Sequence, residues 1–191
     1  KEFFITLFLF LLLVSCQTDD ILPYLKFESS SESMNEDSGS VSLTATDVSN
    51  SYSLTKSGTG TLTLSGANTY DGGTTITAGT IEIDNNSSLG TGALTMTGGQ
   101  LSSNGSTARS LSNTLNLNGN VEIGDASNTG AITLGATSII GASTLTTSSN
   151  VNLGAVSGNN AFTKTGSGTL TVNSISGSGA TTINSGTLIA L

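Results

Sequence analysis

The stretch that decides the fold is residues 58–81, which read GTGTLTLSGANTYDGGTTITAGTI. Leu62 and Leu64 flank a threonine in this stretch, and Ile81 pairs in the same way with Ile83 across Glu82. Apolar and polar residues that alternate with a period of two are typical of a β-strand with one buried face. Glycines between the runs favour turns. The stretch therefore predicts short strands joined by tight turns.

The same alternation recurs along the rest of the chain. Its apolar pairs are Val41/Leu43, Leu94/Met96, Leu115/Leu117, Ile132/Leu134, Val151/Leu153 and Leu170/Val172. From Leu62 to Leu188 the runs follow one another at a mean step of 18 residues. A repeat of about 20 residues built from strands and turns is typical of a solenoid. We expect Leu62, Ile81, Ile132 and Val151 to lie in one interior column.

Internal copying supports a repeat architecture. Residues 55–64 (TKSGTGTLTL) and 163–172 (TKTGSGTLTV) are identical at seven of ten positions. Residues 74–81 and 181–188 are identical at five of eight. The copies are offset by 108 and 107 residues, which corresponds to about six coils at the mean step.

Residues 58–81 resemble the autotransporter-associated β-strand repeat, also called the passenger-associated transport repeat, whose pattern is GxGTLTLSGxNTYxGGTTIxxGTL. The resemblance is close over residues 53–83 and partial over 162–191. It implies a right-handed parallel β-helix that bacteria export, and a role of the repeats in secretion. It implies no catalytic residue, because the motif positions are structural.

These observations predict an all-β chain that forms a right-handed parallel β-helix over residues 41–191, with about 7–8 coils of roughly 18–20 residues. A single coil buries some three aliphatic side chains, too few to offset the ordering of about 20 residues, so stability must come from stacking. We expect the reading frame to continue past Leu191, because the sequence stops within a predicted strand.

The N-terminus carries an export signature. Residues 3–14 are apolar except for Thr6, a run too short for a membrane-spanning helix but suited to the core of a signal peptide. Leu13-Val14-Ser15-Cys16 resembles the lipobox of bacterial lipoproteins, which implies that Cys16 carries a lipid. Cys16 is the only cysteine, so no internal disulfide competes for it. A short anchor or an ordinary signal with an incidental cysteine is the alternative.

A tether is predicted between the signal and the solenoid. Eight of the thirteen acidic residues lie within residues 1–50. The segment after Cys16 is rich in serine and acids and has few large apolar groups, so it cannot offset its ordering entropy. We expect a lipoprotein-type signal at 1–16, a flexible acidic tether at 17–40 and the repeat body at 41–191.

Composition excludes several classes of function. The net charge is −8 and there is no His or Trp, so nucleic-acid binding and histidine-dependent catalysis are excluded. Glu82 with Asp84, and Glu122 with Asp125, could each hold calcium, but no recurring ligand spacing accompanies them. We expect solvated turn acids, no catalytic residue, no metal and no cofactor.

Two further motif residues have open roles. Lys56 and Lys164 occupy equivalent places in the two copies, where they either neutralise carbonyl-rich turns or keep a sheet edge soluble. Tyr70 follows Asn68 and Thr69, and we expect it to pack in the interior rather than bind a ligand.

The sequence therefore predicts a non-catalytic exported protein at the outer membrane or cell surface, held by lipid at Cys16, whose rod is a stalk or adhesive surface. Its expected contacts are the membrane and either surface carbohydrate or a second copy. The alternative is a fragment of a larger passenger whose further part carries a β-barrel or a glycan-active enzyme. Extending the reading frame would separate the two.

Overall fold

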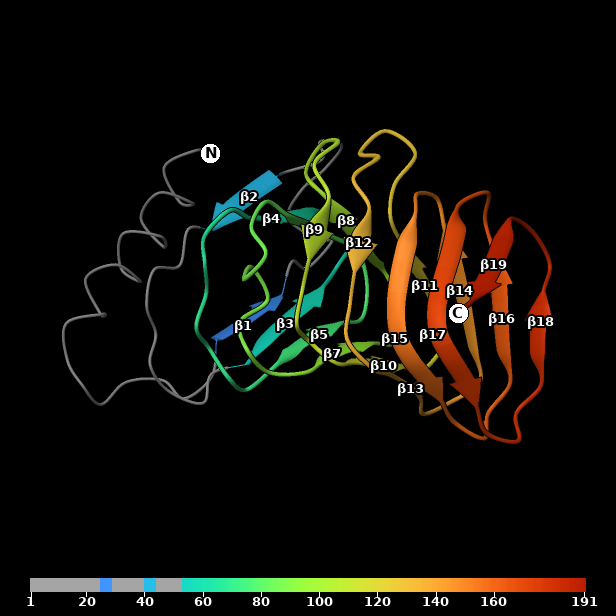
Figure 1. The fold of residues 1–191 in the computed structure, drawn as a ribbon. Helices are drawn as coiled ribbons and strands as arrows, with labels where there is room; N and C mark the ends of the chain where they lie inside the picture. Colours follow the sequence, from blue (N-terminus) through green and yellow to red (C-terminus); the bar gives the residue numbers. More distant parts are fainter. Residues whose placement is uncertain (1–24, 29–39, 44–52) are drawn as a thin grey trace, which may run out of the picture.

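The computed structural model describes residues 25–28, 40–43 and 53–191 (Figure 1). Within these residues every regular element is a β-strand, and the strands pair in parallel. Parallel pairing between consecutive turns of a chain rich in Thr and aliphatic residues produces a β-solenoid, here of about seven turns. The predicted fold class is thus confirmed. No helix that could span a membrane occurs in the described part.

The strands form two sheets, of 8 and 11 strands. The 8-stranded sheet, called face B, consists of β2 (Ser40–Leu43), β4 (Thr61–Leu64), β6 (Thr80–Ile83), β8 (Gln100–Ser103), β11 (Asn120–Ile123), β14 (Ser143–Thr147), β16 (Phe162–Thr165) and β18 (Thr181–Ile183).

The 11-stranded sheet has two parts that share the long strands β15 (Val151–Ser157) and β17 (Thr169–Ser176). Face A contains β1 (Leu25–Glu28), β3 (Leu54–Ser57), β5 (Thr74–Ile76), β7 (Leu94–Met96), β10 (Leu115–Leu117), β13 (Thr137–Ile139) and the second halves of β15 and β17. Face C contains β9 (Arg109–Ser110), β12 (Ile132–Thr133), the first halves of β15 and β17, and β19 (Thr187–Ala190).

Each coil passes from face A to face B and then to the C side. In the first coils the C side is formed by residues 65–73 and 84–93, in which no strand occurs, and β9 is the first strand there. Coil length varies: Leu62 pairs with Ile81, 19 residues further on, but Asn120 pairs with Thr144, 24 residues further on. Figure 1 shows the strands stacked in chain order from the blue end to the red end.

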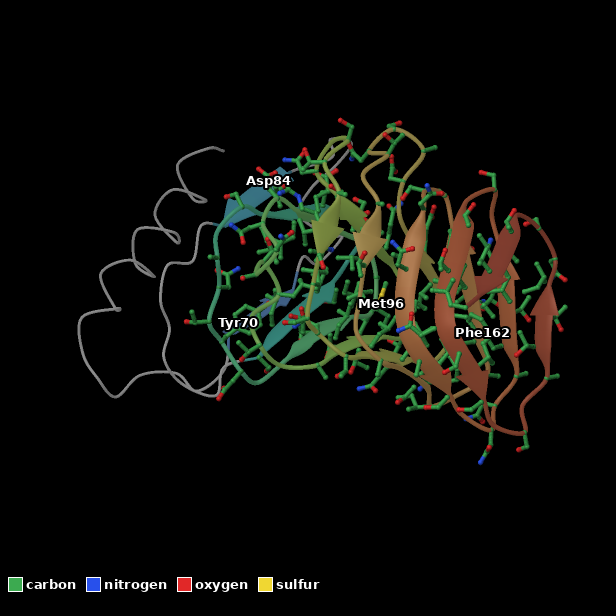
Figure 2. All side chains as sticks on the ribbon, in the orientation of Figure 1. Tyr70, Asp84, Met96 and Phe162 are labelled. Atoms are coloured by element: carbon green, nitrogen blue, oxygen red, sulfur yellow. The ribbon has the colours of Figure 1, made fainter. Side chains whose placement is uncertain are left out.

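The interior is filled by aliphatic columns that run along the solenoid. On face B, Leu62 pairs with Ile81 and Ile81 with Leu101, and all three are at most 3% exposed. Met96 on face A is fully buried and is labelled in Figure 2. Outward residues between them are mostly Thr, Ser and Asn. Alternation with a period of two therefore separates core from surface, as the sequence predicted.

The predicted single column of Leu62, Ile81, Ile132 and Val151 is wrong. Leu62 and Ile81 belong to face B, whereas Ile132 and Val151 pair with each other on face C. All four are buried. The alternating pattern identifies inward residues but does not say which face carries them, because the strands of all three faces have the same period.

The copied segments also lie on different faces. The first lysine-containing segment is β3 on face A, and its copy is β16 on face B. Face A advances five coils from Leu54, through Thr74, Leu94, Leu115 and Thr137 to Val156, before the chain reaches β16. The copies are therefore separated by five turns and one further face, and not by the predicted six coils.

Part of the N-terminal region also belongs to the sheets. Leu25–Glu28, inside the predicted tether of 17–40, form β1 and pair with β3. Ser40–Leu43 form β2 and pair with β4. The signal segment at 1–16, Cys16 and the rest of the tether lie outside the described residues.

Candidate functional site

The most distinctive site in the motif segments is built around Lys56. Lys56 occupies the third position of β3 and points into the solenoid, where its register partners along face A are Ile76, Met96, Leu117 and Ile139. Its side chain is 4% exposed. The ammonium donates to the carbonyl oxygens of Ser57 (3.1 Å), Gly58 (2.9 Å) and Ala78 (3.3 Å). It thus bonds its own turn and the turn of the following coil.

Lys164 repeats this arrangement 108 residues later. It is fully buried in β16, between register partners Leu145 and Ile183. Its ammonium donates to the carbonyl oxygens of Thr165 (3.0 Å), Gly166 (3.2 Å) and Ser185 (3.1 Å). We call the two arrangements the lysine clamps. Of the two roles that the sequence left open, the structure shows the one in which the lysines satisfy turn carbonyls.

Glycines make room for both ammonium groups. Gly79 has a φ of +68° and Gly186 a φ of +72°, which disfavours any residue with a Cβ. A Cβ at Gly79 would lie 2.3 Å from the Lys56 Nζ, and one at Gly186 would lie 2.7 Å from the Lys164 Nζ. The backbone therefore requires a glycine at each of these turns, because a Cβ would lie 2.3 Å from the oxygen of Gly58 or Gly166, and the glycine also leaves room for the ammonium of the preceding coil.

Among the residues that the structure describes, no carboxylate pairs with either clamp ammonium. Within the described residues, both ammonium groups are bonded to carbonyl oxygens and neither forms a salt bridge. Burial lowers the pKa of Lys56 and of Lys164 below the ordinary lysine value. The three carbonyl dipoles around each ammonium replace part of the lost hydration.

The acidic pair on β6 is engaged by other side chains. Glu82 accepts hydrogen bonds from the Thr63 hydroxyl (3.4 Å) and from the amide of Asn128 (3.1 Å), which lies 46 residues further on. Asp84, labelled in Figure 2, forms an ion pair with Arg109. Both carboxylates therefore link successive coils.

The second acidic pair, Glu122 on β11 and Asp125 in the loop after it, is also engaged by hydrogen bonds. Glu122 accepts a hydrogen bond from the hydroxyl of Ser148. Asp125 accepts from the backbone N–H groups of Ser127 (2.6 Å) and Asn128 (2.8 Å), and these bonds lower its pKa. In the part of the chain that the structure describes, no three acidic, histidine or cysteine side chains are grouped so that they could hold a metal ion.

Tyr70 packs inside the solenoid as predicted. It is 9% exposed, and its hydroxyl bonds the hydroxyl of buried Thr74 at 2.7 Å. Burial raises its pKa to about 12. Figure 2 labels Tyr70 and the buried Phe162. These are the two aromatic residues of 53–191, so no aromatic ring is exposed in that range.

The sequence did not reveal the role of two buried asparagines. The Asn68 amide donates to the carbonyl of Ser88 at 2.6 Å, and the Asn113 amide donates to that of Gly92 at 2.6 Å. Ser88 and Gly92 belong to one turn, which lies between the coil of Asn68 and the coil of Asn113. The two asparagines therefore hold this turn from both sides. The signal that could have identified Asn68 was its fixed place before Thr69 and Tyr70 in the motif.

Comparison with known proteins agrees with the geometry. The family model of the passenger-associated-transport-repeat matches residues 54–83 and 162–190. Each match begins in the strand that carries a clamp lysine and ends in or beside the strand after its clamp glycine. No curated protein and no solved structure matches the chain. Two segments of this β-solenoid thus match the passenger-associated-transport-repeat, and each of them contains one lysine clamp.

Proposed function

We propose that the protein is a non-catalytic, exported bacterial surface protein whose β-solenoid is a passenger-like stalk with an adhesive or structural role. The observation that carries the proposal is the pair of transport repeats built into one continuous solenoid. Because the repeat model is named for its association with passenger transport, its presence supports export.

The chemistry of the described residues favours a structural role over catalysis. All three basic residues of 53–191 are engaged: Lys56 and Lys164 bond turn carbonyls, and Arg109 pairs with Asp84. Glu82, Glu122 and Asp125 accept hydrogen bonds from neighbouring coils or their own loop. Groups held in this way support a rigid rod more than they support proton transfer to a substrate.

Export is tested by surface accessibility. Intact cells that express the full chain would be treated with a protease that does not cross membranes, and the fragments would be detected with an antibody to the repeat body. Loss of the solenoid signal, with a cytoplasmic marker preserved, is the expected result. A signal that is protected until the cells are broken would contradict surface exposure.

The lipid anchor is a separate part of the proposal. Cys16 follows an apolar run and is the only thiol in the chain. Cells grown with an alkyne-bearing fatty acid should label the protein, and Cys16→Ala should abolish the label. Undiminished label on Cys16→Ala would contradict the lipoprotein assignment and leave surface export to be judged by protease accessibility.

The adhesive role predicts contact with surface carbohydrate or with a second copy of the chain. The Thr, Ser and Asn side chains on the outer faces supply hydrogen-bonding groups without charge. A glycan array and an autoaggregation assay, each with purified full chain, separate the two partners. Cleavage of a polysaccharide panel that disappears in Glu82→Gln or Asp84→Asn would instead contradict the non-catalytic assignment.

A further inference from the structure

The lysine clamps occur where the pairing of apolar residues is imperfect. In the first repeat, Leu54 lies beside Thr74 and Lys56 lies beside Ile76. In the second repeat, Phe162 lies beside Thr181 and Lys164 lies beside Ile183. In both, an apolar residue faces a threonine and the lysine faces an isoleucine. The same mismatch in both copies, which lie on different faces, indicates that something other than apolar contact sets the register.

A shift of two residues would keep every inward side chain inward. On the faces that carry the clamps, it would place Leu54 beside Ile76 and Phe162 beside Ile183, which improves the apolar pairing. On face B of the first repeat, the same shift would place Leu62 beside Ile83 but leave Leu64 beside Asn85. In the first repeat, the apolar pair gained on face A and the pair lost on face B therefore offset each other.

The ammonium groups distinguish the registers sharply. Each needs a third carbonyl from the following coil, supplied by Ala78 or by Ser185. Each ammonium also lies against the glycine next to that carbonyl. A Cβ at Gly79 or Gly186 would lie within 2.7 Å of the Nζ and 2.3 Å from the backbone oxygen of Gly58 or Gly166. A shift would keep the two acceptors of the lysine's own turn and remove the third, and a buried ammonium that loses an acceptor is destabilised.

The residues that a shift would bring to the glycine position all carry side chains. At the Gly79 position the candidates are Thr77 and Ile81, and at the Gly186 position they are Asn184 and Leu188. Either direction of slip would therefore force a Cβ against a backbone oxygen of the preceding turn, that of Gly58 or of Gly166, as well as against the ammonium. The clamp opposes slip in both directions.

We propose that Lys56 with Gly79, and Lys164 with Gly186, are register locks that select which residues of successive coils pair. The locks act in a chain where alternating Thr and aliphatic residues leave the register weakly specified. A buried polar group that fixes register is a well-attested role for such groups. This inference concerns folding of the solenoid and does not depend on the proposed export or adhesion.

Cysteine cross-linking tests the register directly. In the full chain with Cys16→Ser, the native pair Thr55→Cys/Thr75→Cys reports the observed register, and Thr55→Cys/Thr77→Cys reports a two-residue shift. Neighbouring Cα atoms about 4.8 Å apart can form a disulfide, whereas those displaced by two more residues exceed about 7 Å and cannot. Peptide mapping after mild oxidation identifies the bond formed.

With Lys56 present, the native pair alone should cross-link. In Lys56→Met, which keeps the volume but removes the ammonium, both pairs should cross-link, so that the preference is lost. Met96→Leu, an apolar change at the register partner of Ile76, is the matched control and should keep the preference. If Lys56→Met cross-links only in the native register, the lysine stabilises the fold without selecting it, and the proposal is wrong.

The second repeat provides an independent arm. Thr163→Cys/Thr182→Cys reports the native register there, and Thr163→Cys/Asn184→Cys reports the shifted one, each with Lys164 or with Lys164→Met. Loss of the preference in this repeat alone would overturn the proposal for Lys56 and support it for Lys164. If neither lysine variant folds, the lysines are needed to form the solenoid at all, which also overturns a role limited to register.

Discussion

Lys164 is fully buried, and its register partners in the neighbouring coils are the apolar residues Leu145 and Ile183. A lysine at an inward position is ordinarily destabilising, because its ammonium loses hydration. Here the chain ends each clamp strand at a turn whose carbonyl oxygens point back at the ammonium. The chemistry of these single residues controls how stability depends on pH.

The clamps should make the free energy of unfolding increase with pH in the range that ends at the ordinary lysine pKa. Burial lowers the pKa of Lys56 and Lys164 in the folded state. Between the lowered values and about 10.4, the unfolded chain binds more protons than the folded chain, so stability increases with pH. Urea unfolding of the wild type and of Lys56→Met/Lys164→Met from pH 7 to 10 measures the difference. A wild type that loses stability relative to the double variant in this range would contradict the direction.

The titration of Tyr70 should have the opposite effect at higher pH, so that the free energy of unfolding decreases as pH rises. Its folded pKa is about 12, whereas an unfolded tyrosine loses its proton near pH 10. Between these values the unfolded chain binds fewer protons, so stability falls as pH rises, by at most about 2.7 kcal/mol.

The matched variant for this prediction is Tyr70→Phe. It removes the titrating group and leaves the Thr74 hydroxyl without its partner, a cost that does not depend on pH. Because the lysines are common to both proteins, the difference in unfolding free energy between pH 9 and 12 isolates Tyr70. A constant difference across this range would show that Tyr70 does not titrate as described.

Among the elements, the turns are where sequence constrains structure most tightly. Gly79 and Gly105 both have positive φ, of +68° and +84°. Gly105 has no atom within 4 Å of the place where a Cβ would lie, whereas at Gly79 a Cβ would lie 2.3 Å from the Gly58 oxygen. The two glycines therefore separate backbone strain from steric exclusion.

Replacing these glycines by alanine should have unequal effects. Gly105→Ala should cost about 1–2 kcal/mol through backbone strain alone. Gly79→Ala should cost at least about twice as much, because the coils must also move apart. Urea unfolding measures both losses of stability, with the same dependence of the unfolding free energy on urea concentration used for all variants. Equal losses would indicate that the close approach at Gly79 relaxes without cost.

The loop after β11 is a second element with a defined effect. Asn128 bonds Glu82 through its amide nitrogen and accepts from the N–H of Gly105 at 3.1 Å through its amide oxygen. Asn128→Ala should destabilise the protein by about 1–2 kcal/mol. In a double-mutant cycle, Glu82→Ala, which removes the acceptor, should show a coupling with Asn128→Ala, and Glu122→Ala should show none. Coupling with both would indicate a general change of charge instead of a specific contact.

At the scale of the whole molecule, each coil is stabilised by the coils on either side. Leu115 is fully buried in the middle of the stack, whereas Leu188 is only partly buried in the last coil described. Leu115→Ala should cost about 2–5 kcal/mol, and Leu188→Ala clearly less, because fewer neighbours enclose it. The outward Thr95→Ala should change stability little. Unfolding midpoints in urea would test this order, and an equal loss at both leucines would contradict it.

The sequence predicts the parallel solenoid well because inward and outward residues differ in chemistry along every strand. It predicts less about how coils lie over one another. Ile81 and Ile132 have the same pattern and lie on different faces, since corners are made by glycines and loops of unequal length. Hydrogen-bonded loops such as that of Asn128, and the carbonyl oxygen of Ala78 that accepts from Lys56, involve residues that are distant in the chain and carry no local signal.

The position of the two copied strands on different faces has a consequence for how such genes grow. The first copy begins on one face of the solenoid and the second copy begins on another. The number of coils between copies therefore need not be a whole number. Unequal crossing-over could then insert one strand and its turn, which is one side of a coil, and keep the alternation of inward and outward residues. Only the face on which each later strand lies would change. A new outer surface could thus evolve without a new core.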